Sequence, residues 1–395
     1  MPSTVAAPNP PRKLEPCLLP FGRSFTLPAE AYLSEQVFAW ERTHLFEASW
    51  VCVGRSEDVA RPGDRKAFGA GAEEILVVRD QAGALHAFFN VCRHRGHQLL
   101  QPGACVNATV IRCPYHAWVY GLDGSLKGAP RYGEVEGFDK ADYPLIEARA
   151  AEWRGWLFVN ASGDAPALSG HVGNLDEFVA PYEPERLRSA ARHGYVVKTN
   201  WKIAHENYHE CYHCPSIHPE LCRVTPPDSG ENMAPTGAWA GGTMDLMDHA
   251  ETMSLDGRSH GVALRGLDET RRRQVLYFGL LPNLLISLHP DYVMTHRMEP
   301  LSTDRTLIEC EWLFAPEALE RDGFDPSYAA DFWDVTNKQD WRATESVRRG
   351  VASRGYRQGR LSPVEDAVYA FITTVARAYL GRGVKAPAPA AAASS

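Results

Sequence analysis

The sequence predicts an α+β protein with two structural units, a small antiparallel β domain followed by a larger domain that mixes helices and strands. A chain of 395 residues exceeds what one core usually covers. Over residues 46–160, short β-rich runs alternate with Gly, Asp and Pro turns, whereas residues 171–383 combine helical runs with strand-like runs. The link at residues 161–170 (ASGDAPALSG) is expected to separate the two units.

The β domain is preceded by an N-terminal segment, residues 1–45, for which we expect a tail and one helix. Apolar side chains recur at helical spacing over residues 29–46 (AEAYLSEQVFAWERTHLF), which predicts that helix. Residues 1–16 and 384–395 are rich in Pro, Ala and Ser. Such segments bury too little apolar surface to order themselves, so both ends are expected to be disordered.

Charge and hydropathy exclude several classes of partner. A formal net charge of −8 argues against nonspecific binding to nucleic acid or to anionic membranes. No apolar run reaches the roughly 18 to 20 residues that span a bilayer, and the most apolar stretch, residues 277–294, is interrupted by Pro282, Asn283 and His289. The first residues do not follow the pattern of a secretory signal, so a cytoplasmic location is expected. There the nine cysteines would stay reduced, and clustered ones are interpreted as ligands.

Two short motifs in the predicted β domain each combine one cysteine with one histidine. They are C-x-H at Cys92 and His94, and C-x2-H at Cys113 and His116, with 18 positions between His94 and Cys113. Two thiolates and two imidazoles could hold a structural Zn²⁺ tetrahedrally. They could also hold a [2Fe–2S] cluster, with the cysteines on one iron and the histidines on the other. Zinc fingers usually pair cysteines locally, so one ligand of each type per loop favours the cluster.

A second group of ligand-type side chains lies in the segment NWKIAHENYHECYHCPSIHP, residues 200–219. Pro215 disfavours helical geometry at the residue before it, so a helix is expected to end near His213 and to leave His218 on the next turn. Two imidazoles from neighbouring turns can converge on one ion. Two histidines with one carboxylate leave coordination positions open on ferrous iron, which is how such sites bind O₂.

Other interpretations of the same segment remain open. Cys211 and Cys214 form a C-x2-C pair, which offers a zinc site with the two histidines, although no second such pair accompanies it. Four residues of the segment are interpreted as packing or pocket-lining residues, namely His205, Tyr208, His209 and Tyr212. Asn207 is interpreted as a residue that could touch or orient the metal.

The residues CRHRGHQL and CPYHAW resemble the two loops of Rieske domains in ring-hydroxylating oxygenases. This resemblance implies that Cys92, His94, Cys113 and His116 hold a Rieske [2Fe–2S] cluster. It also implies the fold of the remaining chain, namely a helix-grip catalytic domain with a central antiparallel sheet.

The same resemblance implies a mononuclear Fe(II) centre whose ligands are His213, His218 and Asp340. The pair QD that ends at Asp340, in the run FWDVTNKQDWRATESVRRG, resembles the segment that carries the third iron ligand in the family. Asp334 and Glu345 are nearby alternatives for that carboxylate, because most carboxylates on such helices are merely solvated.

The resemblance further implies a role for Glu210, three residues before the first iron histidine. In the family a carboxylate there links this histidine to a cluster histidine of the neighbouring subunit, which implies a homotrimer. A glutamate in place of the usual aspartate resembles the subgroup acting on betaines, carnitine and choline. Aromatic residues of the second domain could enclose such a cation, the candidates being Trp239, Tyr277, Phe278 and Tyr292.

The expected function is therefore that of the oxygenase component of a Rieske non-haem iron system. The chain has no G-x-G-x-x-G motif placed for a nicotinamide domain, so electrons from NAD(P)H would arrive through a separate reductase or ferredoxin. Activation of O₂ would then hydroxylate a small molecule, with oxidative N-demethylation of a quaternary ammonium compound expected first. Aromatic-ring hydroxylation and O-demethylation use the same metals and stay open. A pure electron-transfer protein and a zinc-stabilised binding module are the alternatives from other classes.

Overall fold

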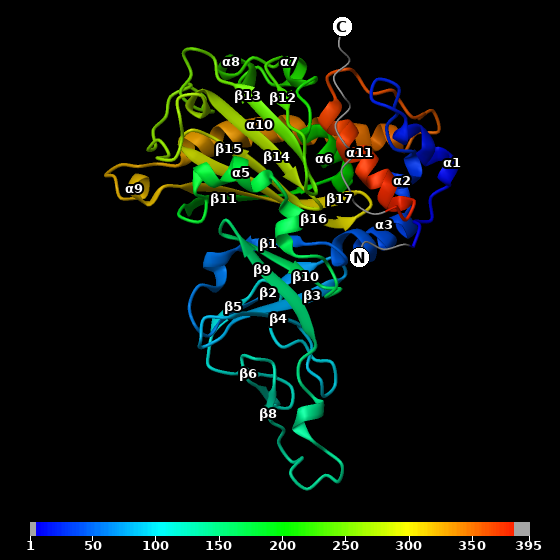
Figure 1. The fold of residues 1–395 in the computed structure, drawn as a ribbon, viewed down its shortest axis with the longest axis vertical. Coiled ribbons are helices and arrows are strands. Elements are labelled where there is room, and N and C mark those ends of the chain that lie inside the picture. The colour runs from blue at the N-terminus through cyan, green and yellow to red at the C-terminus, as the bar shows by residue number, and fades with distance from the viewer. Residues whose placement is uncertain (1–4, 383–395) are drawn as a thin grey trace. The chain divides into compact units, whose positions relative to one another are not determined.

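The computed structural model describes residues 5–382, which divide into two compact units (Figure 1). The first unit comprises residues 42–168, and the second comprises residues 5–41 together with residues 169–382. The predicted disordered tail, residues 384–395, lies outside the described residues. Within the described part of the chain, no helix is long and apolar enough to cross a membrane.

The N-terminal segment is more ordered than its composition predicts. The expectation of disorder over residues 1–16 is wrong for the part that contains α1 (Pro11–Leu14). Leu14 and Cys17 are fully buried, and this segment packs against α11 (Asp366–Tyr379), far away in the sequence. Tertiary packing therefore orders a segment whose local composition disfavours order.

The single helix predicted over residues 29–46 is divided in the structure. It consists of α2 (Ala29–Leu33), α3 (Glu35–Glu41) and a π-helical turn (Arg42–Glu47). Ser34 has extended backbone angles, with φ of −79° and ψ of 121°, and it interrupts the run. Apolar spacing identified the helical residues, but it did not locate this break.

The first unit confirms the predicted antiparallel β domain. Seven strands pair in the order β1-β10-β9-β4-β3-β2-β5, and three short strands form a second sheet in the order β6-β7-β8. The loop after β4 carries one Cys/His motif, and the loop between β6 and β7 carries the other. The strands are β1 (Val51–Arg55), β2 (Asp64–Ala70), β3 (Glu73–Arg79), β4 (Leu85–Phe89), β5 (Cys105–Asn107), β6 (Ile111–Arg112), β7 (Val119–Tyr120), β8 (Leu126–Gly128), β9 (Glu147–Trp153) and β10 (Trp156–Asn160).

The second unit is built on a central antiparallel sheet in the order β11-β17-β16-β15-β14-β13-β12, which confirms the predicted α+β fold. The helices α6, α10 and α11 pack against this sheet, on β16, β11 and β13 respectively (Figure 1). The strands are β11 (Arg188–Val197), β12 (Glu231–Asn232), β13 (Trp239–Asp245), β14 (Gln274–Leu280), β15 (Leu284–Leu288), β16 (Tyr292–Ser302) and β17 (Arg305–Phe314). The remaining helices are α4 (Leu168–Val172), α5 (Leu175–Val179), α6 (Trp201–Tyr208), α7 (Cys214–Ile217), α8 (Leu221–Val224), α9 (Pro316–Leu319) and α10 (Ser327–Val351).

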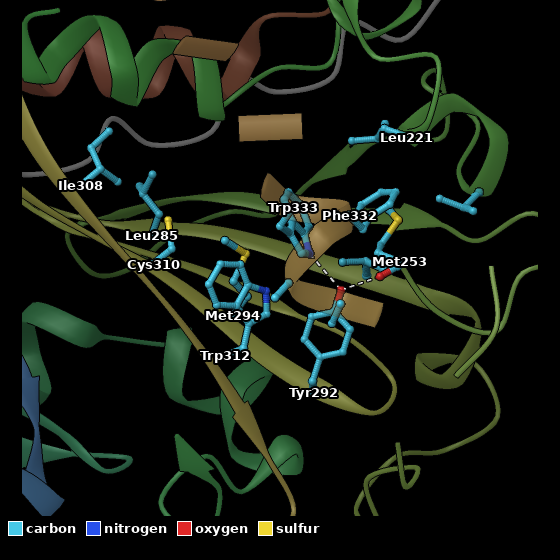
Figure 2. Packing of buried hydrophobic residues seen from close by; sticks show 14 of the residues in the cluster. Leu221, Met253, Leu285, Tyr292, Met294, Ile308, Cys310, Trp312, Phe332 and Trp333 are labelled. Carbon is cyan, nitrogen blue, oxygen red and sulfur yellow. Dashed lines mark hydrogen bonds between the residues drawn. The ribbon is translucent and has the colours of Figure 1, made fainter. Parts of the chain in front are cut away.

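The core of the second unit fixes the orientation of α10 on the sheet (Figure 2). Trp333 on α10 is buried and donates its indole N–H to the hydroxyl of Tyr292 on β16, at 2.9 Å. That hydroxyl donates in turn to the carbonyl of Met253, at 2.8 Å. Asp340 follows Trp333 by two helical turns, so both residues lie on the same face of α10. Burial of the Trp333 ring therefore helps to turn Asp340 toward the interior of the unit.

Candidate metal centres

The two Cys/His loops of the first unit share one backbone geometry. The N–H of Cys92 donates to the carbonyl of His97, and the N–H of Gly96 donates back to the carbonyl of Cys92. The second loop repeats this pair of bonds between Cys113 and the residues at the same offsets, Ala117 and Trp118. The residue four positions after each cysteine has positive φ, 72° in Gly96 and 56° in Ala117. Glycine adopts this conformation at little cost, and alanine does so at a higher one.

These loops bring the four predicted cluster residues together. Cys92 and Cys113 are free thiols with 2% of their surface exposed, and the rings of His94 and His116 lie 4.7 Å apart. Burial raises the pKa of Cys92; the neighbouring Cys113 also raises it, while a hydrogen bond with the Tyr120 hydroxyl at 3.2 Å lowers it. The thiol pair therefore needs a cationic partner to be held as buried thiolates.

The donor set fits a Rieske cluster. The buried Nδ1 of His116 has no hydrogen-bond partner within residues 5–382, so it is available as a ligand atom. Neutral imidazole is the ligand form, and burial lowers the pKa of His94, with the nearby His116 acting in the same direction. Two sulfurs and two imidazoles on two matching loops suit a cluster whose irons differ.

In the second unit, the two predicted iron histidines flank α7. His213 directly precedes that helix and His218 directly follows it. The prediction of a longer helix ending near His213 is wrong, because α6 ends at Tyr208. After the end of α6, the carboxylate of Glu210 accepts the backbone N–H of His213, at 3.1 Å. A side-chain acceptor thus takes the place of a helical carbonyl.

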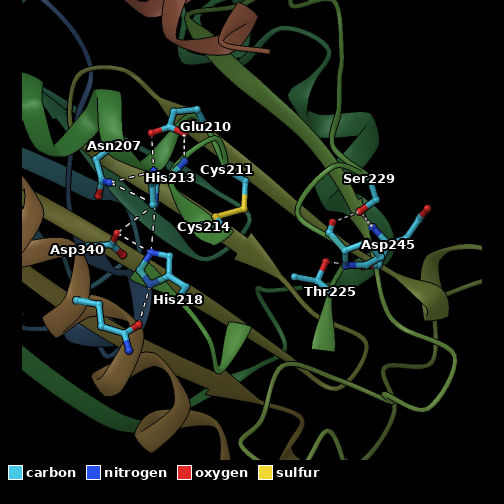
Figure 3. The surroundings of a disulfide bond; sticks show 12 residues. Asn207, Glu210, Cys211, His213, Cys214, His218, Thr225, Ser229, Asp245 and Asp340 are labelled. Atoms are coloured by element: carbon cyan, nitrogen blue, oxygen red, sulfur yellow. Dashed lines mark hydrogen bonds and ion pairs between the residues drawn. A yellow bond between two sulfur atoms is a disulfide. The ribbon is translucent and has the colours of Figure 1, made fainter. Parts of the chain in front are cut away.

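His213, His218 and Asp340 point toward one another (Figure 3). The two Nε2 atoms lie 3.1 Å apart, and Oδ1 of Asp340 lies 2.9 Å from Nε2 of His218 and 3.4 Å from Nε2 of His213. The Nδ1 atoms face other acceptors, Glu210 Oε1 at 2.5 Å and Gln339 Oε1 at 2.8 Å. Each Nδ1 thus carries a proton, so that loss of the Nε2 protons leaves two Nε2 lone pairs and one carboxylate oxygen converging on the same point.

The electrostatics of this point favour a cation. Burial lowers the pKa of His213, but the hydrogen bonds to Asp340 and Glu210 outweigh that effect and raise it to about 9. Burial acts to raise the pKa of Asp340, yet the hydrogen bonds from His213 and His218 hold it below its ordinary value. Two imidazole nitrogens and one carboxylate with open positions are the ligand set preferred by non-haem Fe(II). The residues present therefore fit a mononuclear iron.

The alternative carboxylates have other partners. Asp334 accepts a hydrogen bond from the Tyr195 hydroxyl at 2.7 Å and forms an ion pair with Lys338. Glu345 accepts the backbone N–H of Lys198, at 3.2 Å. The structure thus brings Asp340 to the two histidines, and it brings neither alternative there.

Cys211 and Cys214 are joined by a disulfide beside His213 (Figure 3). The expectation that all nine cysteines stay reduced is wrong for this pair, because a tight turn places their Cα atoms 4.9 Å apart, within the range that a disulfide spans. The sulfur of Cys214 lies within 4.8 Å of ligand atoms of both His213 and His218. A disulfide sulfur is not a thiolate, so the zinc alternative loses its two sulfur ligands.

A small cavity adjoins Asp340, and the space between atoms there is about 340 Å³ when the adjoining open solvent is included. It lies among α6, α10 and strands β15 to β17 and opens partly to solvent. None of the four aromatic residues proposed from the sequence lines it. Trp239 and Phe278 pack against Phe178, and Tyr292 belongs to the core. The lining residues are Ala204, Asn207, Tyr208, Leu285, His296, Met298, Ile308, Asn337, Asp340 and Trp341.

Sequence reasoning missed several of these lining residues. Asn337 and Trp341 lie within one helical turn of Asp340 on α10, so their spacing could have indicated them. His296 lies on β16, and no local signal marks it. Its Nε2 donates to the side-chain oxygen of Asn337 at 2.9 Å, a contact that only the packing of strand and helix creates.

The fold and the two centres define a two-domain iron oxygenase, and comparison with known families agrees. A model of the Rieske [2Fe–2S] domain matches residues 49–139, and a model of the ring hydroxylating alpha subunit catalytic domain matches residues 184–381. The chain belongs to the family of Rieske-type ring-hydroxylating oxygenase alpha subunits. It is accordingly an iron-dependent oxygenase whose cofactors are a [2Fe–2S] cluster and a mononuclear iron.

Individual relatives agree with this assignment. The chain is 31% identical to the glycine betaine monooxygenase oxygenase subunit of Chromohalobacter salexigens, over 85% of this chain and 82% of the relative. It is 33% identical to the carnitine monooxygenase oxygenase subunit of Acinetobacter baumannii, over 86% and 88% of the two chains. The crystal structure of a quaternary ammonium Rieske monooxygenase with its substrate L-carnitine matches with a TM-score of 0.77 at 27% identity, covering 94% of this chain and 99% of that one.

Proposed function

We propose that this protein is the oxygenase component of a two-part system that hydroxylates an N-methyl carbon of a quaternary ammonium compound. Electrons would come from a separate NAD(P)H-dependent reductase, as the term oxygenase subunit in the names of the relatives suggests. The substrates of those relatives, glycine betaine and carnitine, both carry a trimethylammonium group. Support from this chain comes from the cavity beside Asp340.

The composition of that cavity is the observation that carries the proposal. Tyr208, His296 and Trp341 supply aromatic rings, and Leu285, Met298 and Ile308 supply apolar surface. None of the described residues that line it is Lys or Arg. An aromatic face attracts a quaternary ammonium ion, and methyl groups gain from apolar contact. A cavity without cationic side chains therefore suits a cationic substrate.

The cofactor ligands proposed are the residues that the loops bring together. Within a Rieske domain at residues 46–160, Cys92, His94, Cys113 and His116 would hold the cluster. Within a catalytic domain at residues 171–383, the iron would be held by His213, His218 and Asp340. When bound, the iron supplies O₂ activation with electrons relayed by the cluster.

The residues of the chain have separate tasks in this scheme. Glu210 and Gln339 hold the protons on Nδ1 of the two histidines, and Asp340 is held as a carboxylate. The aromatic rings would orient the ammonium group so that one methyl faces Asp340. In the overall reaction, the N-methyl group, O₂, two electrons and two protons give the N–CH₂OH product and water. Cleavage of its C–N bond then releases formaldehyde, a proton and the tertiary amine.

We further propose that three copies assemble head to tail, so that the Rieske domain of one copy serves the iron of the next. Two exposed aromatic side chains support this arrangement. Tyr115, next to His116, is 53% exposed, and Tyr212, between Glu210 and His213, is 65% exposed. Large exposed aromatics are enriched at protein interfaces, and a head-to-tail contact that closes into a ring needs two different patches. Light scattering should then give three times the mass of one chain.

The function is tested by turnover with a defined reductase, NADH and O₂. Glycine betaine, carnitine and choline are compared with benzoate as substrates, and O₂ uptake, formaldehyde and products are measured. We expect formaldehyde in equal amount to coupled O₂ uptake with at least one ammonium substrate. Benzoate that yields a diol with both atoms from ¹⁸O₂ would replace the proposal by aromatic dihydroxylation. An Asp340→Ala variant serves as the control for formaldehyde from other sources.

A further inference from the structure

The second iron histidine is held by a chain of two hydrogen bonds that ends on a carboxylate. Nδ1 of His218 lies 2.8 Å from Oε1 of Gln339, and Nε2 of Gln339 donates to Oε2 of Glu220, also at 2.8 Å. The side chain of His218 is 2% exposed and that of Glu220 is 24% exposed. The chain therefore runs from the partly exposed side of the site to its buried centre.

The chemistry of these groups fixes the direction of each hydrogen bond. The amide N–H group of Gln339 donates to the carboxylate oxygen Oε2 of Glu220. An ionised carboxylate only accepts hydrogen bonds, so the NH₂ of Gln339 must face Glu220. The amide oxygen must then face His218, and that oxygen accepts a hydrogen bond only from a protonated Nδ1. The lone pair of His218 is thereby placed on Nε2, which faces Asp340 and His213.

We propose that Gln339 and Glu220 are positioning residues of the iron site, acting as an amide relay that sets the tautomer and ring orientation of His218. This inference rests on the proposed role of His218 as an iron ligand. The two histidines are thus oriented in different ways. Glu210 accepts the Nδ1–H of His213 directly, whereas His218 is oriented through the amide of Gln339.

The relay also joins the parts of the chain that supply the ligands. His218 directly follows α7 and Glu220 directly precedes α8. Gln339 lies on α10, directly before Asp340. One residue of α10 thus orients His218, and the next supplies the carboxylate. Groups that orient metal ligands in this way typically change metal affinity or activity by about 10- to 100-fold when they are removed.

The relay is tested by the affinity of the protein for Fe²⁺ rather than by turnover. A chelator removes the mononuclear iron, the visible spectrum verifies that the cluster is retained, and anaerobic calorimetry gives the apparent Kd for Fe²⁺. Four variants are compared with the native protein: His218→Ala, Gln339→Leu, the double variant Glu220→Gln/Gln339→Glu, and Gln274→Leu. In the last, a glutamine at the start of β14 that bonds to Asp245 receives the same change away from the site.

The double variant distinguishes a relay from a merely structural role. It exchanges donor and acceptor, so that the amide of residue 220 donates to a carboxylate at 339, which still accepts the proton of His218 Nδ1. We expect Gln339→Leu to weaken Fe²⁺ binding by about 10- to 100-fold. The double variant should recover most of this loss, and Gln274→Leu should bind as the native protein does.

Two results would overturn the relay. In the first, Gln339→Leu binds Fe²⁺ as tightly as the native protein while His218→Ala binds poorly. The poor binding by His218→Ala would then support the proposed iron site, and only the relay would fail. In the second, the double variant binds no better than Gln339→Leu. If His218→Ala itself binds Fe²⁺ normally, the proposed iron site fails and the relay fails with it, so the two failures are distinguishable.

Discussion

Glu210 holds His213 at two points, since one carboxylate oxygen accepts the ring Nδ1–H at 2.5 Å and the other accepts the backbone N–H at 3.1 Å. The side chain of Glu210 is nevertheless 13% exposed. The same carboxylate therefore orients a candidate ligand and remains accessible at the surface. This combination is what a link to a neighbouring subunit requires.

The change Glu210→Gln is expected to slow electron transfer between the two centres while both cofactors stay bound. The amide lacks the negative charge, and its NH₂ cannot accept a proton from a second imidazole. We expect a decrease of about 10- to 100-fold in the rate at which a pre-reduced cluster is reoxidised with substrate and O₂, measured by stopped-flow absorbance. Glu345→Gln, at a partly buried carboxylate bonded to Lys198, is the control. Reoxidation at the native rate with iron bound would contradict the role of Glu210.

Asp340→Ala is expected to remove the mononuclear iron and to leave the cluster in place. Iron analysis should fall from about three to about two atoms per chain with acid-labile sulfide unchanged. Asp334→Ala is the matched control, because that carboxylate lies on the same helix but bonds to Tyr195 and Lys338. Loss of iron in Asp334→Ala and retention in Asp340→Ala would reverse the ligand assignment.

Trp341→Leu is expected to raise the KM for the ammonium substrate. A cation–π contact contributes about 0.5–2 kcal/mol, which corresponds to an increase of about 2- to 30-fold, and Trp341→Phe should lose less. The neutral tert-butyl analogue of the substrate, tested as a competitive inhibitor, should lose little affinity in either variant. Trp239→Phe lies outside the cavity and is the control. Equal losses of affinity for the cationic substrate and its neutral analogue would show that the cavity recognises the shape of the group and not its charge.

Glu206 should make the stability of the protein depend on pH. Burial raises its pKa to about 8, although the Tyr32 hydroxyl donates to it at 2.7 Å and Lys202 also opposes the shift. The folded state therefore binds one more proton than the unfolded state between about pH 4.3 and about pH 8, and stability falls as pH rises through this window. The slope is at most about 1.4 kcal/mol per pH unit.

The variant Glu206→Gln should remove this dependence, because the amide stays neutral at every pH while its oxygen still accepts from Tyr32. We expect its thermal unfolding midpoint to exceed that of the native protein at pH 8 and the difference to shrink toward pH 5. Glu320→Gln, at an exposed position, should show no such difference. A native midpoint that rises between pH 5 and pH 8 relative to Glu206→Gln would contradict the shift.

Features that depend on neighbours in the chain could be predicted from the residue pattern. Each cluster motif spans at most four residues, and the two candidate iron histidines are five positions apart, so spacing alone predicted that the members of each pair lie close together. The alternation of short β runs with turns likewise predicted the first domain. Asp340 was indicated only by resemblance, because more than a hundred residues separate it from the histidines.

Features that depend on contacts between distant segments arise only when the chain folds. The relay from Glu220 through Gln339 to His218, and the cavity wall shared by His296 and Trp341, exist only because α10 packs across the sheet. The order of the segment that contains Leu14 and Cys17 likewise depends on a distant element, because this segment packs against α11. Spacing in the sequence determines which side chains lie on the same turn. Burial in a common core determines which turns of the chain come into contact.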